Sequence, residues 1–138
     1  MIAAGTNQDL LVWDIHKLNK PIGRFNECHN EDITAVKFSP DQSNLMISCS
    51  IDNVLNMFDM NNHDASSGSK LKEEDLIDGA YSSTQPMIDC GFISPELLWT
   101  VTSINTVEFI RVMDAACFLR LTQVSSLLIF TAFHSHHL

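Results

Sequence analysis

The sequence contains few basic residues, which limits the partners that it can attract. Of 138 residues, eight are lysine or arginine and 17 are aspartate or glutamate, so the formal net charge at pH 7 is −9. Binding to the phosphates of a nucleic acid requires an excess of basic side chains, and an anionic membrane surface repels a chain of its own sign. We therefore expect no direct nucleic-acid binding and no attachment to a membrane surface.

Closely spaced cysteines are also missing. The cysteines Cys28, Cys49, Cys90 and Cys117 lie far apart and form no C-x-x-C pair. Small secreted proteins held by disulfides are richer in cysteine, and zinc sites space their ligands more tightly. The N-terminal residues include no basic stretch that would begin a signal peptide. We expect reduced cysteines that act as small apolar residues, in a protein of the cytoplasm or nucleus.

The residue patterns of common enzymes are absent as well. With only five glycines, the chain has neither a G-x-x-x-x-G-K phosphate loop nor a G-x-S-x-G nucleophile turn. His29 and Asp52, together with Ser48 or Ser50, supply the residue types of a catalytic triad. Nucleophilic catalysis also needs an exposed serine beside an oxyanion hole, which nothing in the sequence indicates. We therefore predict that the chain is not an enzyme.

Three histidines near the C-terminus, His134, His136 and His137, are of a type that binds zinc, copper or nickel. No carboxylate or cysteine lies beside them to complete a coordination sphere. We therefore predict no functional metal site and no cofactor.

The composition that is present suits at most one soluble folded domain. Hydrophobic residues make up 45% of the chain, and the mean hydropathy is close to zero, at +0.04. Short apolar runs rich in β-branched and aromatic residues alternate with turn residues, and no convincing amphipathic helix occurs before residue 114. We predict strands at about 1–6, 9–15, 21–26, 32–38, 44–50, 53–59, 86–92, 97–103 and 106–112.

Two patterns recur along these runs. An apolar run ends in an aromatic residue and aspartate at 10–14 and again at 54–59, with Trp13 and Phe58 at corresponding positions. A second run, ending in Ser-Pro, occurs at 36–41 and more loosely at 91–96. Several strands are apolar on both faces, which favours sheets that pack between two neighbouring sheets.

In this order the patterns resemble WD40 repeats. His29 stands where that family has a Gly-His pair, and residues 33–41 resemble the family's inner strand and the turn after it. Residues 48–52 resemble its Ser-Gly-Ser-x-Asp segment, and Phe58-Asp59 stands at its Trp-Asp position. The resemblance implies an all-β fold, a partial β-propeller of about two to three four-stranded antiparallel blades.

In WD40 blades a histidine, a serine or threonine, an aspartate and a tryptophan form a buried hydrogen-bonded network. The resemblance assigns His29, Ser48 and Asp52 to such a network in the second repeat, where Phe58 cannot supply an indole N–H. The first repeat offers Trp13 but no aspartate at the matching turn. We expect an incomplete network in both blades.

The resemblance covers residues 1–112 and implies a propeller segment at 1–113 whose ring is not closed. A ring of about seven blades with roughly 40–45 residues each needs on the order of 300 residues. Residues 61–79 interrupt the pattern with small, polar and then charged residues, so we predict a flexible inserted surface loop there.

Residues 114–138 form an apolar tail that no blade explains. Three interpretations remain open for it: a membrane span, which Arg120 disfavours, a strand-like or collapsed end, or sequence joined by alternative splicing, intron read-through or a gene-model error. The abrupt loss of acidic residues after Asp114 favours the third interpretation.

The resemblance implies a non-enzymatic scaffold segment that binds other proteins. Binding would use further blades, another chain that completes the propeller, or a local surface such as the 61–79 loop. The alternative is a truncated product without independent activity, because open sheet edges and an uncovered apolar face promote aggregation.

Overall fold

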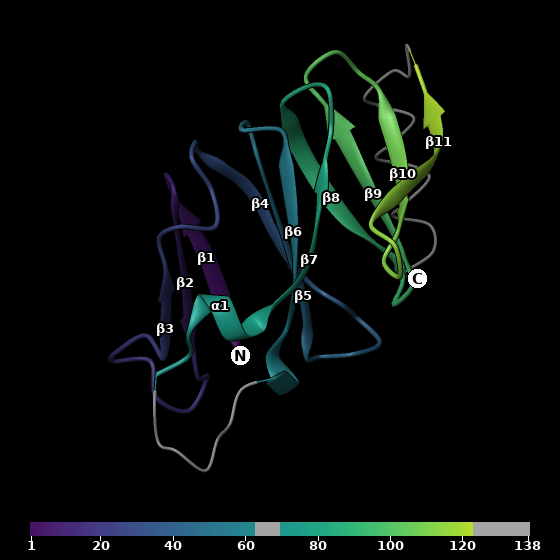
Figure 1. Cartoon of the computed structure of the whole chain (residues 1–138). Coiled ribbons are helices and arrows are strands. Elements are labelled where there is room, and N and C mark those ends of the chain that lie inside the picture. Colours follow the sequence, from purple (N-terminus) through teal and green to yellow (C-terminus); the bar gives the residue numbers. More distant parts are fainter. Residues whose placement is uncertain (63–69, 123–138) are drawn as a thin grey trace.

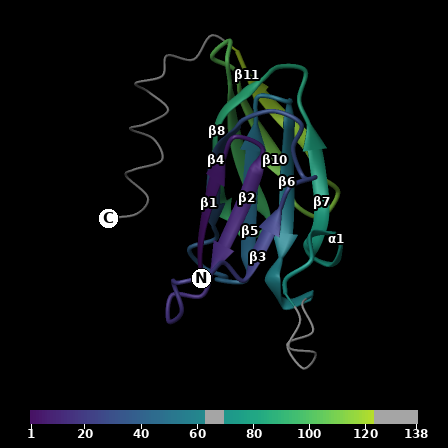
Figure 2. The same cartoon turned by 90° about the vertical axis from the view of Figure 1, so that its left-hand side faces the viewer.

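The computed structural model describes residues 1–62 and 70–122, which fold into three antiparallel β-sheets. The sheets stand face to face like the blades of an open fan (Figure 1). Figure 2 looks onto the first sheet, with the other two stacked behind it. Within the described residues the blades form an arc and not a closed ring.

Each sheet is built from strands that follow one another along the chain. The first contains β1 (Ile2–Thr6), β2 (Asp9–Trp13) and β3 (Gly23–Phe25). The second contains β4 (Ile33–Phe38), β5 (Leu45–Ser50), β6 (Val54–Asp59) and β7 (Ile77–Ser82). The third contains β8 (Met87–Ser94), β9 (Leu97–Thr102), β10 (Val107–Arg111) and β11 (Ala116–Leu121). A 3-10 turn, η1 (Met60–Asn62), and a short helix, α1 (Glu73–Leu76), connect β6 to β7.

The second sheet is apolar on both faces because a neighbouring sheet covers each one. Successive side chains of a strand point to opposite faces. Met46 and Phe58 therefore pack with Leu10, Val12 and Phe25 of the first sheet, and the Phe25 and Phe58 rings stack with centroids 5.8 Å apart. This two-sided packing confirms the prediction made from the apolar runs.

The alternate residues of β5 and β6 point to the third sheet. Ile47 and Met57 lie in one buried cluster with Leu98 and Ile110. The burial of large aliphatic side chains of this kind contributes about 1.5–3 kcal/mol each relative to exposure. The interfaces between the sheets thus hold the main apolar core of the described residues.

The turns between the second and third strands of the last two blades share one conformation. Asn53 and Asn105 have positive φ angles of 71° and 57°. Asparagine tolerates this left-handed region better than most residues, because its short polar side chain bonds locally. The two asparagines mark equivalent positions in repeated blades.

We predicted an inserted loop at 61–79, but most of the described residues in this range belong to a helix or a strand. Residues 63–69 lie outside the described residues, but α1 and the start of β7 fall inside the predicted loop. Leu71 and Leu76 are buried between the first and second sheets. Polar and charged residues separate these two leucines, so the sequence shows no periodicity that would reveal their burial.

The third sheet continues beyond residue 113, where we predicted the end of the propeller segment. Residues 116–121, assigned to an apolar tail, form β11 and pair with β10, so the third sheet extends through Leu121. Most of its side chains are exposed and show no clean alternation of buried and exposed positions, so the sequence does not distinguish a strand from the other interpretations of this segment. Residues 123–138, including the three C-terminal histidines, lie outside the described residues.

Gly91 of β8 provides a test of the packing in the third sheet. A Cβ atom at this position would lie 2.6 Å from the Trp99 indole nitrogen, whereas a Cβ at Gly79 meets nothing nearer than 3.6 Å. We expect Gly91→Ala to lower the free energy of unfolding by about 1–2 kcal/mol, because the indole must move. Gly79→Ala is the matched control and should change stability little. Urea unfolding of both variants measures the difference, and equal effects would contradict this account of Trp99 packing.

Candidate functional site

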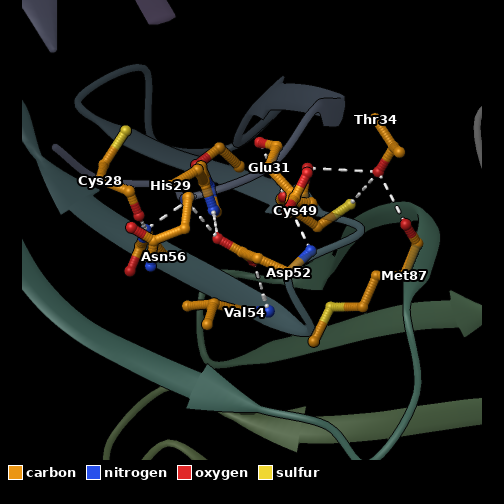
Figure 3. Close-up of polar contacts among 12 residues, drawn as sticks. Cys28, His29, Glu31, Thr34, Cys49, Asp52, Val54, Asn56 and Met87 are labelled. Atoms are coloured by element: carbon orange, nitrogen blue, oxygen red, sulfur yellow. Dashed lines mark hydrogen bonds and ion pairs between the residues drawn. The ribbon is translucent and has the colours of Figure 1, made fainter. Parts of the chain in front are cut away.

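A buried polar network ties the loop before β4 to the turn after β5 (Figure 3). The His29 ring lies between Ser48 Oγ, 2.8 Å from Nε2, and Asp52 Oδ2, 3.1 Å from Nδ1. The His29 side chain is fully buried, and Ser48 has no exposed surface. The structure therefore brings together three of the four residues that the sequence analysis assigned to a polar network.

Asn56 lies beside these residues, and its amide indicates which ring nitrogen of His29 accepts a hydrogen bond. Its Nδ2 donates to the Cys28 carbonyl at 2.6 Å, which fixes the orientation of the amide. The same Nδ2 lies 3.5 Å from His29 Nε2. Because an amide N–H faces Nε2, this ring nitrogen is the hydrogen-bond acceptor, and it also accepts from the Ser48 hydroxyl. The proton therefore lies on Nδ1, which donates to Asp52.

Asp52 holds the turn after β5 in place through its hydrogen bonds. Burial alone would raise the pKa of its carboxyl, but the carboxylate accepts hydrogen bonds from the backbone N–H of Asn30 and Val54, both at 2.9 Å, and from His29. Together these bonds outweigh burial and hold the pKa of Asp52 below its ordinary value. The ionised carboxylate thus joins the 26–32 loop to the 50–53 turn.

A depressed pKa predicts a specific dependence of stability on pH. Because the pKa of Asp52 is lower in the folded than in the unfolded chain, its contribution is complete above the unfolded value of about 3.9 and is lost as the pH falls through the folded value. We expect Asp52→Asn to reduce stability at pH 7 and to flatten the decline below pH 4. Thermal melts from pH 7 to pH 2.5 measure both effects. Asp41→Asn, at an exposed position, is the matched control, and a slope in Asp52→Asn equal to that of the unsubstituted chain would refute the assignment.

Trp13 does not join the network. It is the last residue of β2 and pairs with Ile2 in the first sheet, in keeping with its assignment to a different repeat. At the position of the family tryptophan in the second sheet, Phe58 stacks on Phe25 and supplies no polar hydrogen. Asn56, on the same face of β6, provides the N–H that Phe58 lacks.

The arrangement of serine, histidine and aspartate matches the order of a catalytic triad but not its accessibility. Ser48 Oγ lies against the ring inside the interface between two sheets, where no substrate atom can reach it. Burial and the neighbouring Glu73 raise the pKa of the Cys28 thiol to about 12, so this sulfur stays protonated at neutral pH. The geometry supports a structural role for both groups.

A second buried polar network, which the sequence analysis missed, joins the second and third sheets. Glu108 of β10 is 1% exposed, accepts from the Tyr81 hydroxyl at 3.0 Å and pairs with Arg120 Nε at 2.8 Å. Burial and the hydrogen bond to Glu108 raise the pKa of Tyr81, so its hydroxyl remains a donor. Arg120, the residue that disfavoured a membrane span, is therefore the ion-pair partner of a buried carboxylate.

The two networks occupy equivalent places in successive blades. Asn56 pairs with Ser48 in the second sheet, and Glu108 pairs with Thr100 in the third. The segments Ser-Cys-Ser-Ile-Asp-Asn at 48–53 and Thr-Val-Thr-Ser-Ile-Asn at 100–105 share hydroxyl residues and the turn asparagine. This match could have located Glu108 in the sequence, but the partners Tyr81 and Arg120 lie on strands that the sequence analysis did not predict.

His29 and Asp52 lie at one end of the molecule, which we call the loop end and define as residues 6–8, 26–32, 50–53, 83–86 and 103–106. Ile33 N–H donates to the Asn7 carbonyl, and the Thr34 hydroxyl donates to the Met87 carbonyl at 2.9 Å. These bonds bring the turns of all three sheets to the same end. The loop end contains no lysine or arginine, and it exposes Ile51 and Ile104.

Proteins similar to this chain are WD-repeat proteins. An uncharacterised WD repeat-containing protein of Saccharomyces cerevisiae is 26% identical over 80% of this chain and 26% of its own length. The WD repeat-containing protein GTS1 of Arabidopsis thaliana is 23% identical over 92% of this chain and 31% of its own length. A WD repeat-containing protein 89 homolog of Dictyostelium discoideum is 31% identical over 46% of this chain and 18% of its own length. The chain thus spans at most about a third of these relatives.

The fold agrees with these names. A chain in the crystal structure of the mitotic checkpoint complex, a WD40 propeller, superposes with a TM-score of 0.69 over 89% of this chain and 35% of its own length, at 14% identity. The chain is built of WD40-type blades. No protein-family model matches it.

Residues 1–62 and 70–122 contain neither a metal-binding cluster nor a membrane-spanning helix. No cluster of three or more histidine, cysteine or acidic side chains could hold a metal ion in this part of the chain. Among the same residues, no helix has the length and apolar character needed to span a membrane.

Proposed function

We propose that the chain is a non-enzymatic scaffold segment of a WD-repeat protein that binds other proteins through its loop end. The observation that supports this is the buried network of His29, Ser48 and Asp52. It holds the loop and the turn in fixed positions while the adjacent side chains remain exposed. A pre-organised surface loses less conformational entropy when it binds. We place the protein in the cytoplasm or nucleus, consistent with four free cysteines.

The chemistry of the loop end indicates the kind of protein that it would bind. Glu31 and Asp32 are exposed there, Ile51 is 40% exposed and Ile104 is 58% exposed. Exposed apolar side chains surrounded by polar and acidic groups are suited to a protein partner that carries apolar and basic residues. The absence of basic residues from the loop end makes a nucleic-acid partner unfavourable.

Paired surface variants test this proposal. Ile51→Asp with Ile104→Asp changes the loop end, whereas Ile15→Asp with Leu18→Asp introduces the same charges at similarly exposed positions away from it. Each variant is first checked for an unchanged melting temperature. Co-precipitation from cells, quantified by mass spectrometry, should recover the same proteins with the unsubstituted chain and the control. The loop-end variant should lose them, and equal recovery by both variants would refute the proposal.

The alternative, a truncated product with no independent activity, draws on a different observation. β1 forms one edge of the first sheet, and Phe118 of β11 is 50% exposed at the other end of the fan. Unpaired strand edges and exposed aromatic residues promote aggregation. Light scattering and calorimetry on the purified chain separate the two functions. Soluble aggregates without a cooperative transition would favour the alternative, and a cooperatively melting monomer would refute it.

A further inference from the structure

Cys49 and Cys90 lie on facing strands of the second and third sheets. Cys49 of β5 follows Ile47 by two residues, so its side chain also points to the third sheet. Cys90 of β8 belongs to the same buried cluster, and both cysteines are 0% exposed. A hydrogen bond joins the two thiols, and this bond together with burial raises the pKa of the Cys90 thiol well above its ordinary value. The interface therefore contains a pair of cysteines, one from each sheet.

The two sheets approach each other closely at this point (Figure 3). The Thr34 hydroxyl lies 3.3 Å from Cys49 Sγ and donates to the Met87 carbonyl of β8 at 2.9 Å. One short side chain of the second sheet thus reaches the backbone of the third, whereas stacked sheets are usually about 10 Å apart. A disulfide requires Cα atoms that are about 4.4–6.8 Å apart. The close approach at Thr34 favours a bond of this kind between Cys49 and Cys90.

The other two cysteines lie apart from this pair. Cys28 packs in the cluster between the first and second sheets, and Cys117 is on β11, which β9 and β10 separate from β8. In the sequence, however, Cys28 is nearer to Cys49, and Cys117 is nearer to Cys90, than Cys49 is to Cys90. Because an unfolded chain closes short loops more readily than long ones, it would form those two shorter pairings. Only the folded chain favours the pairing of Cys49 with Cys90.

We propose that Cys49 and Cys90 form a reversible disulfide between the second and third sheets when the chain meets hydrogen peroxide. Peroxide is a small molecule and reaches the buried thiols when the interface opens locally. The deprotonated Sγ of one cysteine attacks a peroxide oxygen, so that the O–O bond breaks, an S–O bond forms and water leaves. The other Sγ then attacks this sulfur, the S–O bond breaks, the S–S bond forms and a second water carries away the proton. Two thiols are oxidised, and one peroxide is reduced to two waters.

The disulfide should stabilise the folded chain, because residues 49–90 become a closed loop that restricts the unfolded state. We expect the melting temperature to rise by several degrees after peroxide treatment and to return to its original value after addition of dithiothreitol. Cys28→Ala with Cys117→Ala retains both sulfurs of the pair and should show the same shift. Cys90→Ala is the matched variant that should show none. An equal shift in Cys90→Ala, or no shift in the unsubstituted chain, would contradict the proposal.

Peptide mapping of the unsubstituted chain makes the test independent of whether the variants fold. After peroxide treatment, iodoacetamide blocks the remaining thiols and prevents exchange. Trypsin cleaves after Lys37, Lys72 and Arg111, so each of the four cysteines lies in a separate peptide. Mass spectrometry without reduction then identifies the linked peptides. We expect the link between Cys49 and Cys90 in native buffer.

The same oxidation in concentrated urea provides the control for the role of the fold. There we expect Cys28 linked to Cys49 and Cys90 linked to Cys117, because short loops close first. Other pairings in native buffer, links only between molecules, or cysteines that remain unlinked would each overturn the proposal. The same distribution of links in native buffer and in urea would also overturn it, because the fold would then not select the pair.

Discussion

Replacement of His29 by alanine should lower the free energy of unfolding by about 2–4 kcal/mol, the largest effect that we expect from a single substitution. The side chain is fully buried and bonds to Ser48 and Asp52. Its loss leaves the Ser48 hydroxyl without its acceptor in an interface closed to water, and it creates a cavity between the first and second sheets. Chemical denaturation monitored by far-UV circular dichroism measures the change.

His16→Ala is the matched control for this prediction. His16 is exposed and follows β2, and only its backbone N–H is bonded, to Asp14. We expect a change within about 0.5 kcal/mol for this variant. If both histidine variants had the same stability, the network would not contribute to holding the loop and the turn together.

Replacement of Arg120 by leucine should lower the free energy of unfolding by about 2 kcal/mol, because the buried carboxylate of Glu108 loses its counter-charge. The estimate is below the 3–5 kcal/mol typical of a fully buried pair, since Arg120 is 44% exposed and water replaces part of its interaction. Equilibrium unfolding in urea measures the loss. Arg111→Leu, at the end of β10, removes an exposed ion pair with Asp114 in the following turn and should change the free energy of unfolding by less than about 1 kcal/mol.

A second substitution should rescue the Arg120→Leu variant. In Arg120→Leu with Glu108→Gln, the neutral amide oxygen still accepts from Tyr81 and no uncompensated charge is buried. We expect the double variant to be more stable than Arg120→Leu alone. Additive costs of the two substitutions would show that Arg120 and Glu108 are not energetically coupled.

The two networks explain why successive blades can differ in sequence and still pack alike. At equivalent positions of the sheets, one interface contains an amide hydrogen-bonded beside a histidine, and the next contains a carboxylate paired with an arginine and a tyrosine. Among the described residues no buried side-chain nitrogen or oxygen lacks a hydrogen-bond partner. Each interface satisfies its buried polar groups with a different set of residues. A sequence pattern defined by the residues of one interface therefore fails to identify the next blade.

The sequence by itself determined the all-β class and the WD40 resemblance, and the resemblance assigned His29, Ser48 and Asp52 to one polar network. The all-β class and the resemblance depend on local alternation, turn residues and recurring patterns, which are visible in the linear sequence. Only the tertiary structure placed Asn56 beside His29 and paired Glu108 with Tyr81 and Arg120, because those contacts join strands of different sheets or strands separated by loops.

The same distinction accounts for β7 and β11, neither of which is among the strands that we predicted with bounds. β7 and β11 are the outermost strands of their sheets and bury few side chains, so their residues show little of the alternation that marks a strand. They form because β6 and β10 offer unpaired backbone groups at those edges. The sequence determined which runs must be buried, and the tertiary structure decided which neighbouring segments complete their sheets.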